Sequence, residues 1–194
     1  MSADEFRKAM RLWASGVSIV TTRRGSGLQG ITVSSFCALS LEPPLVLICI
    51  AHTARSHPLI AEQRVFAVNV LREDQRDLSE LAASREGESG AWLEGVPCTT
   101  AATGAPILRD CLAWIDCSLA AQHEGGDHTI YVGRVEAAGA SDGKPLLYFH
   151  SGYRRLAELR PAPPRAATRR AGPARGSARR SRAGARRGRS RKNS

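Results

Sequence analysis

"GITVSSFCALSLEPPLVLICI", residues 30–50, places a run of hydroxyl side chains between two apolar segments that predict β-strands. Ser34 and Ser35 are consecutive, and consecutive residues of a strand point to opposite faces of the sheet. At least one of these serines must therefore point inward or lie outside the strand. Residues 45–50 are apolar without alternation, so a strand buried on both faces is expected there. Hydroxyl groups clustered at the end of an apolar strand pair are a first indication of a ligand site.

The basic character of the chain comes from its C-terminal part. The 194 residues include 28 basic and 18 acidic side chains, and 13 of the basic ones lie from Arg160 onward without any acidic partner. Residues 1–159 therefore carry a net charge of −3. Residues 160–194 contain no Leu, Ile, Val or aromatic side chain, which predicts a disordered basic tail after a domain of residues 1–159. Non-specific nucleic-acid binding by this tail is an open alternative, but an unselected extension is preferred because the body has no recognition motif.

The N-terminus and the cysteines favour a cytoplasmic protein. The first ten residues carry charges where a signal peptide needs an apolar stretch, and no run approaches the roughly 18 apolar residues of a membrane span. The five cysteines form no CxxC pair, so we expect reduced thiols, no disulfide and no zinc site. His52 and His57 lie close in sequence, but nothing nearby supplies the third ligand that a metal needs, and no metal site is expected.

Spacing and turn signals predict about seven strands and few helices. Ser2 and Glu5 form a capping-box pattern for a helix over residues 4–14, and Glu124–Asp127 is a hairpin signal. Strands are expected over residues 17–22, 28–34, 45–50, 65–71, 112–123, 129–138 and 145–150. Further helices are expected near residues 58–62 and 74–83, with a long surface loop over 84–105. This order favours a mainly β fold, an antiparallel barrel with a few helices on its flank.

A second polar segment, residues 52–58, leads into a predicted helix. Pro58 suits a first helical turn and Ser56 suits the cap before it. An anion is stabilised at a helix N-terminus, and Arg55 adds a positive charge, so a phosphate site is one interpretation. The other is that Ser56 is only a cap and Arg55 only a solvated charge. Together with the hydroxyl cluster, the segment suits a ligand with many acceptors, such as a flavin with its ribityl phosphate.

Four segments of the chain resemble the short-chain flavin reductase family, the reductase components of two-component flavin-dependent monooxygenases. They are "GITVSSFCALSLEPPLVLICI", "RVFAVNVL", "GDHTIYVGRV" and "KPLLYFHSGYRRL", in the family's order between about Phe6 and Leu156. The resemblance implies the FMN-binding split-barrel fold, an antiparallel split β-barrel with a few flanking helices. It implies a homodimeric NAD(P)H-dependent flavin reductase with flavin at or near the subunit interface. Reduced FMN or FAD would pass to a separate monooxygenase, with NADH preferred to NADPH as the reductant.

The resemblance also implies a set of binding residues. The flavin ring and ribityl chain would contact one strand end, namely Gly30, Ile31, Thr32, Ser34 and Ser35. Cys49, Ile50 and Ala51 would close the other side of the ring, and Arg55 with Ser56 would bind the phosphate. Asp127 and His128 match the family's GDH motif, which lies against the nicotinamide; the alternative is a tight turn with Asp127 bonding backbone. Arg154 would approach a phosphate, and His150 stands where the family often has Arg.

No side chain is expected to act as an acid or base, because the cofactors themselves carry hydride transfer. A second hypothesis from another class is a split-barrel protein that binds flavin without turning over NAD(P)H. Such a protein would keep the Ser and Thr cluster but would not need the GDH motif. The presence of Gly126, Asp127 and His128 therefore favours the reductase.

Overall fold

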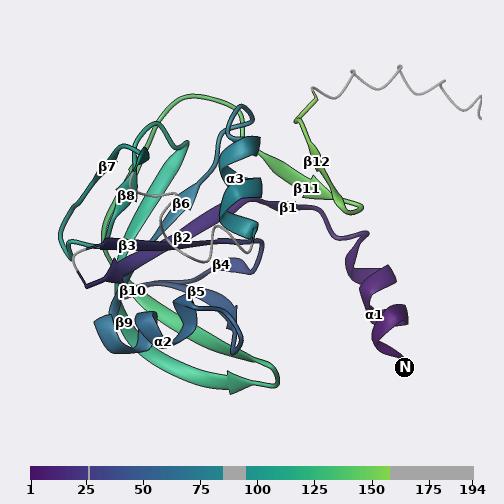
Figure 1. Ribbon diagram of the computed structural model, residues 1–194, viewed down its shortest axis with the longest axis horizontal. Helices are drawn as coiled ribbons and strands as arrows, with labels where there is room; N and C mark the ends of the chain where they lie inside the picture. The colour runs from purple at the N-terminus through teal and green to yellow at the C-terminus, as the bar shows by residue number, and fades with distance from the viewer. Residues whose placement is uncertain (26, 85–94, 158–194) are drawn as a thin grey trace, which may run out of the picture. The chain divides into compact units, whose positions relative to one another are not determined.

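The computed structural model describes residues 1–25, 27–84 and 95–157, and this part of the chain is mainly β with three helices (Figure 1). The helices are α1 (Ala3–Met10), α2 (Ser56–Gln63) and α3 (Arg76–Ala83). The strands are β1 (Ser15–Gly16), β2 (Ser18–Arg24), β3 (Gly27–Val33), β4 (Phe36–Leu41), β5 (Pro44–Ala51), β6 (Val65–Val70), β7 (Cys98–Thr99), β8 (Ile107–Leu108), β9 (Ala113–Gly125), β10 (His128–Ala140), β11 (Leu147–Phe149) and β12 (Gly152–Arg154). No helix in these ranges is long and apolar enough to cross a membrane.

A seven-stranded antiparallel sheet forms the body, in the order β3-β2-β6-β9-β10-β5-β4. Its two edge strands, β3 and β4, follow each other in sequence with only Ser34 and Ser35 between them. Such a short link spans roughly 10 Å, so the sheet must curl until its edges come together. Within the described ranges no ladder of hydrogen bonds joins β3 to β4. The fold is therefore the predicted antiparallel barrel, split between β3 and β4.

The barrel interior is filled by alternate side chains of its strands. Val20, Ile48, Phe66 and Tyr131 form part of the main core cluster, and α2 adds Ile60. In β5 the burial alternates, so that one face lies in the core and the other is half-exposed. The prediction that this strand is buried on both faces is therefore wrong. Helices α2 and α3 pack mainly on β2 and β3, and α2 also contacts β5 and β6.

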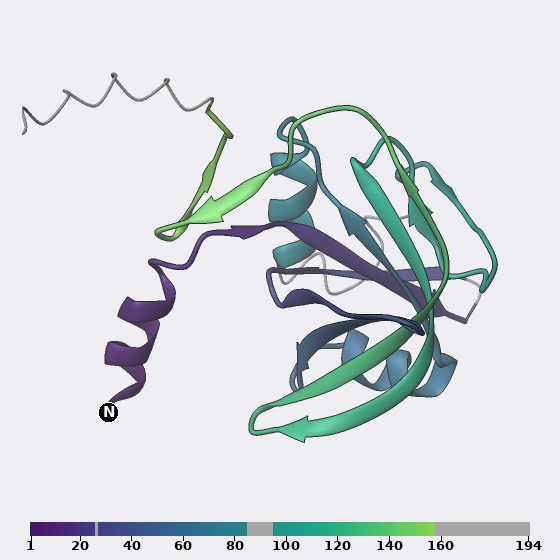
Figure 2. The same ribbon diagram turned by 180° about the vertical axis from the view of Figure 1, so that it is seen from behind.

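The longest elements are β9 and β10, which form the predicted hairpin (Figure 2). Gly126 in its turn has φ of +76°, a conformation that favours glycine. The start of β10 pairs with the end of β5 on its other side. The hairpin therefore brings its turn to the same end of the barrel as the segment that leads into α2.

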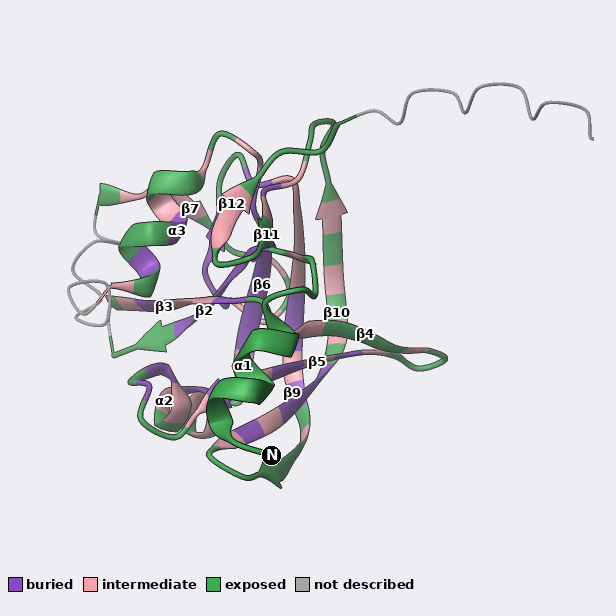
Figure 3. Ribbon diagram, turned by 90° about the vertical axis from the view of Figure 1, so that its right-hand side faces the viewer, coloured by how far each residue is buried: buried purple, intermediate pink, exposed green. Residues whose placement is uncertain are grey.

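Several boundaries differ from the sequence prediction. The N-terminal helix has the predicted capping box at Ser2 and Glu5 but ends at Met10 rather than at residue 14, and none of its residues is buried (Figure 3). Strands β1, β4, β7, β8 and β12 were not predicted, because they are short or largely exposed and show no clear alternation. Ala105, expected in a surface loop, is fully buried. Residues 160–194, the predicted disordered tail, lie outside the described residues, and the division at residue 159 stays a prediction.

Candidate functional site

The split between β3 and β4 is held by one of the two consecutive serines. Both Ser34 and Ser35 lie between the strands, so the expectation that at least one points inward or leaves the strand is met. The Ser35 hydroxyl donates to the Cys49 carbonyl at 2.8 Å and accepts from the Cys49 N–H at 3.2 Å. This pair of bonds fastens the link to β5, while Ser34 stays exposed. We call residues 34–35 the seam.

Strand β3 has a single neighbour in the described sheet, β2, so its other side carries backbone groups outside the ladder. Gly30, Ile31 and Thr32 lie on this edge strand. The Thr32 hydroxyl donates to the Ser79 carbonyl of α3 at 2.8 Å, which anchors the strand. Because the Thr32 hydroxyl already has an acceptor, the part of β3 that stays open to a ligand is its edge backbone.

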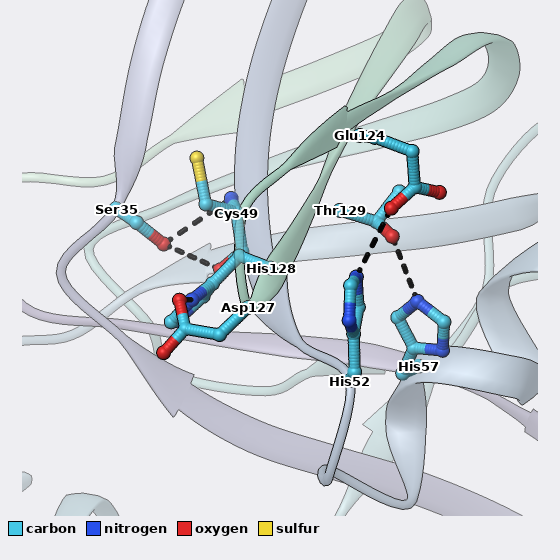
Figure 4. A network of polar contacts seen from close by, with 8 residues as sticks. All are labelled: Ser35, Cys49, His52, His57, Glu124, Asp127, His128 and Thr129. Atoms are coloured by element: carbon cyan, nitrogen blue, oxygen red, sulfur yellow. Dashed lines mark hydrogen bonds and ion pairs between the residues drawn. The ribbon is translucent and has the colours of Figure 1, made fainter.

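The end of β5 joins the seam to the hairpin turn (Figure 4). In the ladder Cys49 lies opposite Ile130 and Ala51 opposite His128, and the His52 N–H donates to the Asp127 carbonyl at 3.0 Å. Ile50 is buried in the core, so only its backbone faces this region. The seam, the end of β5 and the hairpin turn thus form one continuous strip, residues 34–35, 49–51 and 127–128, which we call the strip.

At the hairpin end of the strip, the Asp127 carboxylate and the His128 imidazole form a hydrogen-bonded pair. Oδ1 of Asp127 lies 2.6 Å from Nδ1 of His128, and this bond lowers the pKa of the Asp127 carboxyl. The Asp127 side chain is 94 % exposed and that of His128 42 % exposed. The two side chains therefore form an accessible polar pair beside the end of β5.

The phosphate-site prediction concerns the start of α2. Arg55 occupies the N-cap and makes no side-chain cap bond, so the prediction that Ser56 is the cap is wrong: Ser56 is the first helical residue. It is 2 % exposed, and its hydroxyl is buried without a hydrogen-bond partner. Such an orphaned hydroxyl typically costs about 1–3 kcal/mol. The Ser56 hydroxyl can donate to a phosphate oxygen, because it has no acceptor in the protein. A phosphate reaches this hydroxyl only if the atoms that enclose it move.

Two hollows share Ser34 in their lining. One of about 260 Å³ lies against the segment after α1 and includes Trp13 and His150; the other, of about 180 Å³, includes Thr32 and Tyr153. Tyr148 lines both. Sequence reasoning missed this aromatic wall, although the "LYFHSGY" segment, residues 147–153, was a signal for it.

Arg154 is not brought to the strip. It lines a separate hollow of about 500 Å³ together with Glu73, Asp74 and Arg76. Its guanidinium donates to the Tyr153 carbonyl at 2.8 Å. Its predicted contact with a phosphate stays a prediction, and requires a ligand that extends beyond the strip.

A polar cluster behind the strip was not predicted as functional. Nε2 of His57 lies 2.8 Å from Oγ1 of Thr129, and Nε2 of His52 lies 3.4 Å from Oε2 of Glu124 (Figure 4). Burial, together with the neighbouring His52 ring, lowers the pKa of His57. Among the described residues no group of three His, Cys, Asp or Glu side chains could hold a metal ion.

Comparison with known proteins places the chain in a family. Residues 10–157 match the family model described as flavin reductase like domain. The reductase subunit HsaB of a flavin-dependent monooxygenase from Rhodococcus jostii is 40% identical over 149 residues, 76% of this chain and 75% of that protein. The FMN reductase (NADH) SmoA of Agrobacterium fabrum is 37% identical over 155 residues, 80% of this chain and 87% of that protein.

A solved structure gives the same result. The Streptomyces globisporus NADH:FAD oxidoreductase SgcE6, in complex with NAD and FAD fragments, superposes with a TM-score of 0.73 at 31% identity. The superposition covers 79% of this chain and 92% of that one. Most of the chain thus matches the family in both sequence and fold, and the protein belongs to the flavin reductase like domain family.

Proposed function

We propose that the protein is an NADH-dependent flavin reductase that supplies reduced FMN or FAD to a separate monooxygenase. The observation that carries the proposal is the strip, which runs without a break from the hydroxyl seam to the Asp127–His128 turn. When bound, the flavin accepts a hydride from the reduced nicotinamide, and this chemistry belongs to the cofactors. The chain's own task is to hold two rings together in the right orientation.

One end of the strip, together with the adjoining edge of β3, suits the flavin ring. The edge backbone of Gly30, Ile31 and Thr32 offers N–H groups outside the ladder, and the seam adds the exposed Ser34 hydroxyl. Ser35 acts indirectly, since both of its bonds go to Cys49 and fix the end of β5. N–H donors aimed at a ring that gains negative charge on reduction stabilise the reduced form.

The phosphate subsite lies at the start of α2, with Arg55 and Ser56. A phosphate there gains from the helix N-terminus and from the Arg55 charge. The orphaned Ser56 hydroxyl is the structural feature that supports this assignment.

The nicotinamide subsite lies at the hairpin turn. Nδ1 of His128 lies 2.6 Å from Oδ1 of Asp127, and His128 lies opposite Ala51 in the ladder, so its imidazole is accessible beside the end of β5. No proton transfer is assigned to either residue, because both act by position. The GDH motif is the feature that favours turnover of NADH over flavin binding alone.

We also propose that the protein is a homodimer. Leu41 at the end of β4 is 89 % exposed, and the α1 side chains Phe6 and Met10 are about half exposed. The outer face of β5, with Leu45 and Leu47, is also only half-buried. Monomeric proteins rarely expose so much apolar surface, and a second copy is the cover that we propose. Light scattering should give about twice the 20.8 kDa chain mass, and a monomer would contradict the assembly.

We propose a cytoplasmic location. All five cysteines are unpaired, and reduced thiols persist in reducing compartments.

The test of function is steady-state oxidation of NADH and NADPH by the full chain, with FMN or FAD added. We expect NADH oxidation that depends on added or co-purified flavin, with NADPH slower. Binding of FMN and FAD without oxidation of either nucleotide would support the binding-only alternative instead.

A further inference from the structure

Two short segments meet behind the strip. Residues 52–57, which lead from β5 into α2, carry the proposed phosphate ligands, and residues 126–129, which lead from the hairpin turn into β10, carry the proposed nicotinamide contacts. Their backbones touch through the His52 N–H and the Asp127 carbonyl at 3.0 Å. A side-chain bond joins them as well, because Nε2 of His57 lies 2.8 Å from Oγ1 of Thr129 (Figure 4).

His57 is held in one place by its surroundings. Its carbonyl accepts a hydrogen bond from the Tyr131 hydroxyl at 2.8 Å, and its ring centroid lies 5.7 Å from that of Tyr131 and 5.1 Å from that of His52. Tyr131 is itself buried on β10. The start of α2 is thus fastened to β10 at two successive points on one face of the strand, Thr129 and Tyr131.

His57 and Thr129 each adjoin a proposed ligand contact in the sequence, and this is why the hydrogen bond between them matters. His57 follows Ser56 directly, and Thr129 follows His128 directly. Adjacent residues in a strand point to opposite faces, so holding Thr129 inward, where it is 4 % exposed, holds His128 outward. A single hydrogen bond, between His57 and Thr129, therefore connects the residue next to Ser56 with the residue next to His128.

We infer that His57 and Thr129 are a positioning pair that sets the phosphate subsite and the nicotinamide subsite at a fixed separation. The inference rests on the proposed function. Neither side chain contacts a ligand; they act through Ser56 and His128. The nearby pair of His52 and Glu124 is a poor candidate for this role, because its side chains are 40 % and 82 % exposed and exposed ion pairs contribute little.

The test removes the bond without changing the size of the side chain. Thr129→Val replaces the hydroxyl by a methyl group, whereas Thr129→Ser keeps the hydroxyl. For each variant we would measure the KM for NADH at saturating FMN and the Kd for FMN by fluorescence quenching. Loss of one ordinary hydrogen bond corresponds to about two- to tenfold. We expect Thr129→Val to raise both constants by that factor and Thr129→Ser to restore both.

The other partner gives an independent version of the test. His57→Leu breaks the same bond from a half-buried helical position, so the result does not depend on the folding of Thr129→Val. His57→Gln places an amide nitrogen near the position of Nε2 and should restore both constants. In the double variant His57→Leu/Thr129→Val, the effects should be less than additive, because the bond is lost only once.

The matched control is Thr22→Val, which removes a buried threonine bond to the Val65 carbonyl, 2.7 Å long, on β2 and away from the strip. It should lower the melting temperature without changing either constant. The inference is overturned if Thr129→Val behaves like Thr22→Val, or if only one of the two constants changes. Failure of the wild-type chain to oxidise NADH would instead reject the proposed function, and the two failures are distinguishable in the same set of assays.

Discussion

The Ser56 hydroxyl allows a test in which stability and ligand affinity move differently. Ser56→Ala removes a buried hydroxyl that has no partner, so no protein hydrogen bond is lost. The desolvation cost of an unsatisfied group is about 1–3 kcal/mol, and its removal should leave the unfolding free energy unchanged or raise it. A buried serine that has a partner should behave in the opposite way. Ser79, whose Oγ lies 3.0 Å from the hydroxyl of Tyr153, is the control, and Ser79→Ala should lower the unfolding free energy.

The ligand side of this prediction has its own magnitude. A hydrogen bond to a charged group contributes about 1.5–3 kcal/mol, which corresponds to roughly 10- to 150-fold in affinity. If Ser56 binds the phosphate, Ser56→Ala should weaken FMN by a factor in that range. Riboflavin lacks the phosphate, so its affinity should be unchanged.

The assay is titration of FMN and riboflavin by fluorescence quenching, with urea denaturation of the same preparations. The phosphate assignment is refuted if the ratio of FMN to riboflavin affinity is the same in Ser56→Ala and in the wild type. A marked loss of stability in Ser56→Ala would refute the premise that the hydroxyl is unpartnered.

Three further predictions concern other parts of the chain. His128→Ala should raise the KM for NADH several-fold to roughly hundredfold with little change in FMN affinity, and unchanged NADH kinetics would remove His128 from the site. Because the pKa of His57 is lowered in the fold, stability should fall as the pH drops below about 6.5, and urea midpoints at pH 7 and pH 5 should differ less in His57→Gln than in the wild type. A chain that ends at residue 159 should keep its flavin affinity and NADH turnover, since residues 160–194 lack core-forming side chains; a large drop in melting temperature would contradict this.

The sequence predicted the strands that carry strong periodicity and missed those that do not. The hairpin of β9 and β10 was predicted because two long patterns flank a Gly-Gly-Asp turn. Strand β4 was missed because its side chains are largely exposed, so no alternation marks it. The prediction that β5 is buried on both faces was wrong because an apolar run in the sequence does not show whether one face of the strand or both are covered.

The candidate site residues were named from motifs, but their arrangement was not predicted. Only the register of β5 against β10 shows that Cys49, Ala51 and His128 lie close together. Arg154 was named from its motif, but in the fold it lines a hollow that is separate from the strip. His57 and Thr129 were missed as a pair because they are 72 residues apart in the chain.

The proposed flavin site along the split between β3 and β4 would give the bound flavin a mechanical role. A closed barrel holds its edges with a ladder, but here the edges depend on a two-residue link and on the bonds between Ser35 and Cys49. A ligand seated along that edge ties the two halves of the sheet as an added strand would. Resistance to unfolding then depends on flavin concentration by mass action, about 2.7 kcal/mol at a hundred times the Kd. Each time such a reductase releases reduced flavin to another enzyme, the free energy of unfolding of its barrel would therefore fall.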